Sequence, residues 1–192
     1  MRGGRIIVLS GPGGVGKDTV IEALRQRHPQ LGYSVSYTTR PARPYEREGV
    51  HYRFVTGPRF QSLLESGDML EHALINGYHY GTSAQLVNEQ LEQGRDVILK
   101  IDVQGAEQMR RSRPDALFIF LKPPSMNELL RRRRARDSES AAEMEARQRL
   151  AVEEMGNAAA YDHVIVNDEL DQTVAAIESI LAAGAGDQRG PL

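Results

Sequence analysis

A glycine-rich segment near the start of the chain constrains the fold more than any other feature. The sequence reads GPGGVGKDT from Gly11 to Thr19, directly after the apolar run RIIVLS at Arg5–Ser10. A buried strand, a glycine-rich turn and a helix start, in this order, are the context of a phosphate-binding loop of the pattern G-x-x-x-x-G-K-[ST]. Its glycines let backbone N–H groups face an anion, and Lys17 supplies a positive charge for the terminal phosphates of a nucleotide.

The last position of this motif departs from the pattern. It should hold a hydroxyl that helps to bind Mg²⁺, and here it holds Asp18. A carboxylate in the first turn of a helix suits the helix dipole and can cap backbone N–H groups. It can also hold Mg²⁺ through water, because Mg²⁺ keeps several waters in such sites. The sequence leaves both roles open, and Thr19 is no simple replacement because it points about 100° away on a helix.

The rest of the chain alternates apolar β-branched runs with helical patterns. Further strand candidates lie at 96–101, 116–121 and 163–167, and each is followed by a helical stretch. This alternation predicts an α/β fold, with a phosphate-loop core whose mostly parallel sheet is flanked by helices. Between residues 34 and 92, short Tyr-, Thr- and Val-rich segments among Pro and Gly predict a small α/β insertion. An Arg- and Glu-rich helical stretch at 125–157 predicts a mobile lid.

We therefore expect a single domain over residues 1–192, because this length suffices for one domain with its own core. The core is expected at 1–33, 93–124 and 158–183, the insertion at 34–92, the lid at 125–157 and a disordered tail at 184–192.

Composition limits the partners. The net charge of −2 provides no global basic field for nucleic acid or membrane, and the absence of cysteine excludes disulfides and thiolate metal sites. The apolar run near the N-terminus is too short for a signal peptide or a spanning helix. We expect a soluble, cytoplasmic protein that binds neither nucleic acid nor membrane.

A second group of residues could bind another phosphate. SVSYTTRPARP at Ser34–Pro44 carries Arg40 and Arg43, whose guanidinium forks match phosphate oxygens. GVHYRFV and YHYGT bring Tyr52 and Tyr80, whose hydroxyls could donate hydrogen bonds to it. Taken one at a time, each arginine could be solvated and each tyrosine could be a packing residue.

Together these segments resemble guanylate kinase, of the phosphate-loop nucleoside monophosphate kinases. The resemblance runs from about Arg5 to about Ile180 and is carried, in the family's order and spacing, by SGPGGVGK, SVSYTTRPARP, GVHYRFV, YHYGT, IDVQGA, LKPPS and YDHVIVND. It implies an ATP:GMP phosphotransferase that uses Mg²⁺ and gives ADP and GDP. It also suggests a monomer or a small homo-oligomer.

The resemblance implies roles for residues on the GMP side. The phosphate of GMP is held by Arg40, Arg43, Tyr52 and Tyr80. The guanine is read by Ser36, Glu71 and Thr82, and Asp102 completes the GMP-binding set. The chemistry agrees, because a carboxylate can accept both N1–H and the exocyclic amine of guanine, whereas adenine lacks this donor pair. A buried carboxylate left unpaired would penalise AMP strongly.

The resemblance also implies the ATP side. ATP is bound by the phosphate loop, the helix start, a lid arginine and an asparagine beside the adenine: Gly11, Pro12, Gly13, Gly14, Val15, Gly16, Lys17, Asp18, Thr19, Arg132 and Asn167. The catalytic set is Lys17, Arg40, Arg136 and Arg147. The metal is held through water by Asp18 and Asp102.

Three positions depart from the family's pattern. Lys100, two residues before Asp102, stands where the family often has an acid, so its charge could alter phosphate or metal contacts. His72 and His79 stand where aromatic residues are common, and we expect both to be packing or surface residues.

Two other functions stay open. A related kinase of ribose 1,5-bisphosphate shares the core, and an Asp after the loop lysine is familiar in it, but its acceptor has no base to be read. The other is a non-catalytic guanylate-kinase-like binding module. Such modules have typically lost the phosphate loop, whereas this chain keeps Gly16 and Lys17.

Overall fold

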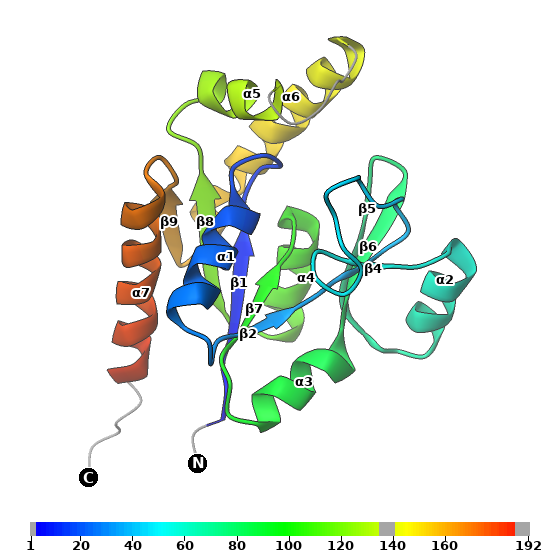
Figure 1. Cartoon of the computed structure of the whole chain (residues 1–192), viewed down its shortest axis with the longest axis vertical. Helices are drawn as coiled ribbons and strands as arrows, with labels where there is room; N and C mark the ends of the chain where they lie inside the picture. Colours follow the sequence, from blue (N-terminus) through cyan, green and yellow to red (C-terminus); the bar gives the residue numbers. More distant parts are fainter. Residues whose placement is uncertain (1–2, 135–140, 187–192) are drawn as a thin grey trace. The chain divides into compact units, whose positions relative to one another are not determined.

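Figure 1 shows the computed structural model, which describes residues 3–134 and 141–186. These residues fall into two units. The first unit comprises Met1–Ser10 and Gln30–Ile119, and the second comprises Gly11–Pro29 and Phe120–Leu192. The boundary between Ser10 and Gly11 means that the strand before the phosphate loop and the loop itself are assigned to different units.

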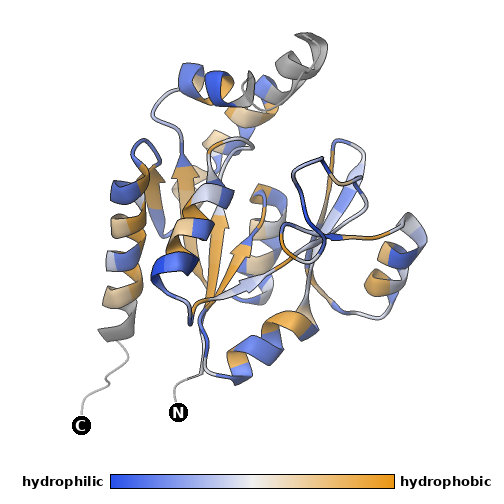
Figure 2. Ribbon diagram, in the orientation of Figure 1, coloured by the Kyte–Doolittle hydropathy of each residue, from blue (hydrophilic) through white to orange (hydrophobic). Residues whose placement is uncertain are grey.

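The first unit contains three parallel strands in the order β2 (Gly32–Ser34), β7 (Val97–Lys100) and β1 (Ile6–Ser10). Every residue of β1 and β7 is buried, and both strands are hydrophobic along most of their length in Figure 2. Strands buried on both faces are continuous apolar runs, which is why the sequence pattern predicted them. Helices α3 (Ala84–Glu92) and α4 (Val103–Ser112) pack against these strands.

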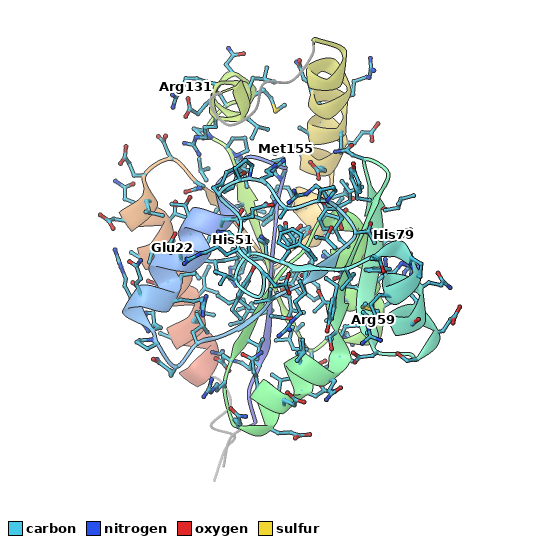
Figure 3. The ribbon with its side chains drawn as sticks, turned by 45° about the vertical axis from the view of Figure 1, so that its right-hand side comes forward. Glu22, His51, Arg59, His79, Arg131 and Met155 are labelled. Atoms are coloured by element: carbon cyan, nitrogen blue, oxygen red, sulfur yellow. The ribbon has the colours of Figure 1, made fainter. Side chains whose placement is uncertain are left out.

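A second, four-stranded sheet lies in the same unit. Its order is β4 (Arg53–Phe54), β3 (Tyr37–Thr38), β6 (Tyr78–Ser83) and β5 (Met69–Ile75), with α2 (Gly57–Glu65) between β4 and β5 in the chain. β5 and β6 pair antiparallel across Asn76 and Gly77, which both have positive φ, as an Asn-Gly hairpin requires. His79 of β6 stacks on Phe60 of α2, with ring centroids 5.1 Å apart, so it is a packing residue as predicted. Arg59, which precedes Phe60 on α2, is exposed (Figure 3).

The second unit contains the phosphate loop and most of the C-terminal part of the chain. β8 (Leu117–Lys122) begins in the first unit and ends in the second. After β9 (His163–Val166), the backbone N–H of Asn167 donates to the carbonyl of Lys122, the last residue of β8. α1 (Lys17–Arg27) packs beside α7 (Leu170–Gly186), as Figure 1 shows in blue and red. The unit also holds α5 (Met126–Arg134), α6 (Ala141–Gly156) and the short 3₁₀ helix η1 (Ala158–Ala160).

The predicted α/β class is confirmed, because parallel strands alternate with helices along the chain. The predicted insertion contains the four-stranded sheet, α2 and α3, and the predicted lid contains α5 and α6. The division into core, insertion and lid stays a prediction. α7 continues to Gly186, past the predicted start of the tail at 184. Within the described ranges no helix is both long enough and apolar enough to cross a membrane.

Candidate functional site

The phosphate loop joins β1 to α1 and depends on glycine at two positions. Gly11 and Gly16 have φ of 138° and 106°, a region that other residues rarely adopt. A side chain at Gly11 would run into the carbonyl of Leu121, and one at Gly16 would come 2.6 Å from the amide nitrogen of Asn167. At these two positions the loop therefore has room for backbone only, as a close approach to phosphate needs.

Lys17 begins α1, and its ammonium stays close to the loop. Its Nζ donates to the carbonyl oxygens of Gly11 and Pro12, at 2.5 and 3.3 Å, while Val15 N–H closes a turn onto Pro12 at 3.1 Å. Asp18 is the acidic residue of the first turn of α1 and is exposed. A lysine, a helix N-terminus and turned backbone thus lie within one short segment.

Two residues from later parts of the chain, one in α5 and one after β9, contact this loop. Asn167, 5 % exposed, donates from Nδ2 to the carbonyl of Val15 at 2.8 Å. Arg132 donates from Nη1 to the carbonyls of Asn167 and Val15, at 2.9 and 3.3 Å. The structure therefore brings both predicted ATP-side residues to the loop.

Sequence reasoning missed Glu128, which orients Arg132. Its Oε1 accepts from Arg132 Nε at 2.7 Å, and both of its carboxylate oxygens accept from the exposed Arg131 (Figure 3). These hydrogen bonds, from Arg131 first and then Arg132, hold the pKa of Glu128 well below its usual range. The signal in the sequence was a Glu four residues before an Arg on a helix.

In the first unit, the residues predicted to hold the acceptor phosphate cluster around Tyr80. Arg40 donates from Nε to the Tyr80 hydroxyl at 3.1 Å. The rings of Tyr52 and Tyr80 meet edge to face at 5.7 Å, and Arg40 Cζ lies 5.6 Å from the centroid of Tyr52. Arg43 lies further out, with 35 % of its side chain exposed, and donates to the Tyr45 hydroxyl at 3.2 Å.

Sequence reasoning also missed Glu46, three residues after Arg43. Its carboxylate, only 5 % exposed, accepts from Arg40 Nη2 at 2.7 and 2.8 Å and from the backbone N–H of Arg43 at 2.8 Å. Burial would raise the pKa of Glu46, but the hydrogen bonds from Arg40 and Arg43 lower it below its ordinary value. Burial would likewise lower the pKa of Arg40, yet the bonds to Glu46 and Tyr80 raise it, so this pair stays charged.

The three residues predicted to read a guanine also lie together. Thr82 Oγ1 donates to Glu71 Oε1 at 2.5 Å, and Ser36 Oγ lies 3.4 Å from Thr82 Oγ1. Glu71 is 4 % exposed, and its burial raises its pKa to about 7, with the Thr82 hydrogen bond opposing and the charge of Asp102 adding to the shift. A side chain at Gly105 of α4 would run into Glu71 Oε2, so this glycine makes room for the carboxyl group.

Asp102 and Lys100 lie at the end of β7. Asp102 caps α4, because its Oδ1 accepts from Gly105 N–H at 2.9 Å, and its Oδ2 accepts from Gln104 at 3.3 Å. Lys100 is 8 % exposed, and its Nζ lies 4.4 Å from the centroid of the Tyr52 ring. Within the part of the chain that the structure describes, no group of three His, Asp or Glu side chains could hold a metal ion.

Two predicted catalytic residues cannot be placed. Arg136 lies outside the described residues, and Arg147 lies in a part of α6 whose side chains are not described. The described residues that were predicted to bind ATP therefore lie in the second unit, and those that were predicted to bind GMP lie in the first.

Comparison with known proteins gives the same assignment over nearly the whole chain. A family model described as guanylate kinase matches residues 3–184. A guanylate kinase of Synechococcus sp. (strain JA-3-3Ab) is 48 % identical over 178 residues, which cover 93 % of this chain and 82 % of that protein. A guanylate kinase of Alkalilimnicola ehrlichii is 46 % identical over 180 residues, covering 94 % of this chain and 89 % of that protein.

Solved structures agree. The guanylate kinase from Anaplasma phagocytophilum has a TM-score of 0.80 at 35 % identity, covering 95 % of this chain and 87 % of that chain. The SH3-kinase fragment of tight junction protein 3, with a TM-score of 0.50 at 12 % identity over 95 % of this chain and 58 % of that chain, shares the fold alone. The resemblance predicted from the motifs is thus confirmed. By sequence and by fold, this chain belongs to the guanylate kinase family of ATP:GMP phosphotransferases.

Proposed function

We propose that this chain transfers the γ-phosphoryl group of ATP to GMP through the two residue groups described above. The observation that carries the proposal is the buried Glu71 carboxyl, hydrogen-bonded to Thr82 beside Ser36. When ionised, a carboxylate accepts N1–H and the exocyclic amine of guanine together. Thr82 uses its one hydroxyl hydrogen to hold Glu71, so the hydroxyl of Ser36 is left to donate to O6. AMP cannot satisfy this carboxylate, so it should be rejected by several orders of magnitude.

The acceptor phosphate belongs, in this proposal, to Arg40, Tyr52 and Tyr80, with Arg43 as a further cation. Arg40 donates from Nη2 to both carboxylate oxygens of Glu46, and from Nη1 to the carbonyl of Pro41 at 2.7 Å. The arginine is thus oriented before the ligand arrives, which lowers the ordering cost of binding. We assign Glu46 as a positioning residue.

The donor belongs to the phosphate loop and Lys17, with Arg132 as a lid arginine and Asn167 beside the adenine. Asp18, exposed in the first turn of α1, is accessible to a hydrated cation and so fits a role toward Mg²⁺. Mg²⁺ would be held by the ATP phosphates, by water and by Asp18 and Asp102, and it would neutralise charge on the transferring group. ATP and GMP are both cytoplasmic metabolites, which supports a cytoplasmic location.

The chemistry needs no strong general base, because the attacking oxygen already belongs to a phosphate anion. The residues of this chain contribute alignment and charge neutralisation instead. Arg40 and Lys17 offset the repulsion between the two phosphate groups. Arg136 and Arg147 of the predicted lid would cover the transferring group and exclude water, which suppresses ATP hydrolysis.

A coupled assay with ATP and three acceptors tests this function. We expect rapid turnover with GMP and very slow turnover with AMP or ribose 1,5-bisphosphate. Faster turnover with ribose 1,5-bisphosphate than with GMP would overturn the acceptor assignment and explain Asp18. ATP titration by calorimetry with Mg²⁺ present is the second arm, since a protein that binds no ATP is a binding module rather than a kinase.

A further inference from the structure

One side chain of α4 bonds to both backbone groups of the residue that follows Glu71. Gln108 Oε1 accepts from the backbone N–H of His72 at 3.1 Å, and Gln108 Nε2 donates to the His72 carbonyl at 2.6 Å. A neighbouring strand makes the same pair of bonds to a residue opposite it, so the Gln108 amide takes the place of a strand at this point. Nε2 also donates to the carbonyl of Gln104 at 3.4 Å. Gln108 has no role in the function described above.

The strand that Gln108 contacts is irregular where Glu71 begins to pair. β5 stands at one end of the order of the four-stranded sheet, so within the described chain this sheet holds it from the β6 side only. The register of β5 on β6 shifts between Met69 and Glu71, where two steps along β5 match one step along β6. A bulge of this kind bends a strand and re-aims the side chains beside it. Gln108 therefore bonds to an edge strand directly after its bulge.

The same face of α4 serves Glu71 at two positions. Gly105 and Gln108 are three residues apart on the helix and so are neighbours on its surface. Gly105 leaves room for the carboxyl group, because a side chain there would run into Glu71 Oε2. Gln108 fixes the backbone of the next residue, while Thr82 of β6 donates to Glu71 Oε1 at 2.5 Å. The carboxyl group and the backbone that carries it are thus held by different groups.

We propose that Gln108 is a positioning residue for recognition of the base. By fixing the β5 backbone at His72, it sets where the Glu71 carboxylate meets N1–H and the exocyclic amine of guanine. The inference rests on the proposed function, because it takes GMP as the acceptor and Glu71 as the group that binds its base. Two parallel hydrogen bonds to one carboxylate demand a closer fit than one. A shift of β5 should therefore weaken GMP more than IMP, whose base offers N1–H without the amine.

Calorimetric titrations with GMP and IMP at pH 8 test this role. Burial raises the pKa of Glu71 to about 7, so its carboxyl group is mostly ionised at this pH. Gln108→Met keeps the length and helix propensity of the side chain but removes both bonds to His72. We expect the Kd for GMP to rise about tenfold, the lower end of the range for a hydrogen bond to a charged group, and the Kd for IMP to rise much less. Gln61→Met, which removes an exposed amide of α2, should change neither Kd.

A double-mutant cycle separates the positioning of Glu71 from a general loss of structure. In a Glu71→Gln background, Gln108→Met should raise the Kd for GMP by no more than about twofold, because the carboxylate that it positions is already gone. Two outcomes would overturn the role of Gln108. One is a loss of GMP affinity that is equally large in both backgrounds, and the other is a single variant in which the preference for GMP over IMP does not change.

Gln108→Glu provides the same test if Gln108→Met does not fold. Its carboxylate can still accept from the His72 N–H, but it repels the His72 carbonyl, so the preference for GMP over IMP should fall here as well. An unchanged preference in this variant would also count against the role of Gln108. Failure of the proposed function gives a different result, because the unsubstituted protein would then bind GMP no better than AMP.

Discussion

Glu71 links the protonation of a buried carboxyl group to the choice of base. Burial raises its pKa to about 7, against the Thr82 hydrogen bond and with the charge of Asp102, while guanine needs the ionised form. We therefore expect the affinity for GMP to rise as pH increases through 7 and to fall about tenfold per pH unit below it. Calorimetry across this range measures the effect. Glu71→Gln should retain only the weaker step from the GMP phosphate, near pH 6; a wild-type profile with that step alone would contradict the role of Glu71.

The same carboxyl group should destabilise the ligand-free protein at high pH. The folded-state pKa of about 7 lies above the ordinary glutamate pKa of 4.5, so the folded state holds this proton to a higher pH than the unfolded state does. Its stabilising contribution is complete below pH 4.5 and is lost as pH rises through 7, a change of roughly 3 kcal/mol. Glu71→Gln should therefore stabilise the protein by up to ~3 kcal/mol at pH 8, and by much less at pH 5, in urea unfolding. Glu107→Gln, on the exposed side of α4, is the matched control, and an equal gain there would contradict the explanation.

The residues that sequence reasoning found and missed differ in how they act. The residues that it found are bonded in pairs, Arg40 with Tyr80 and Glu71 with Thr82. Their residue types alone indicate phosphate or base binding. Glu46 and Glu128 act by holding an arginine in place, and a glutamate near arginines is common on any surface. Only the fold shows that Glu46 is buried, so its role could not be predicted from the chain alone.

At the scale of elements, α4 leaves room for the buried carboxyl group of Glu71 by having glycine at position 105. Ala in place of Gly inside a helix usually stabilises by about 0.5–1 kcal/mol. At Gly105 we expect the opposite, because the new methyl group would run into Glu71 Oε2 and displace the carboxyl group. Gly105→Ala should lower the free energy of unfolding and weaken GMP binding, as measured by urea unfolding and calorimetry. Gly156→Ala in α6, where nothing lies within 4 Å of the added atom, should be neutral or stabilising, and a similar loss there would refute the steric account.

The first turn of α1 gives a test of the irregular residue in the phosphate loop. If Asp18 holds Mg²⁺ through water, Asp18→Ser should raise the Mg²⁺ concentration that gives half the maximal rate, with little change in stability. If the residue serves the helix dipole alone, the Mg²⁺ dependence should stay the same, and stability should fall by about 0.3–1 kcal/mol. Glu22→Gln, an exposed acid further along the same helix, controls for the loss of a negative charge (Figure 3).

At the scale of the whole molecule, long apolar runs were predicted well and short pairings were not. The candidates at 96–101, 116–121 and 163–167 correspond to β7, β8 and β9 within one residue at each end, because each contains a continuous apolar run. Burial on both faces explains the run in β7 and in most of β8, whereas β9 is mostly exposed. The two-residue strands β3 and β4 depend on partners far away in the chain, which no local pattern specifies. The division of the chain at Ser10 is equally invisible in the sequence, because it separates a strand from the loop that follows it.

That division predicts that the binding of ATP and the binding of GMP can be lost independently. Lys17 and its loop belong to one unit, whereas Arg40 and Tyr80 belong to the other. Lys17→Ala should therefore abolish transfer and weaken ATP binding while leaving the Kd for GMP nearly unchanged. Arg40→Ala should also reduce transfer, but it should weaken GMP binding and leave the Kd for ATP nearly unchanged. Separate titrations with ATP and GMP measure the two Kd values, and single-turnover experiments measure the rate of transfer. If Arg40→Ala weakens ATP as much as GMP, or leaves GMP affinity and turnover intact, Arg40 is not an acceptor ligand. The combination of a selective binding loss with a much larger loss of transfer is what alignment-driven catalysis requires, because the rate depends on both phosphates being held at once.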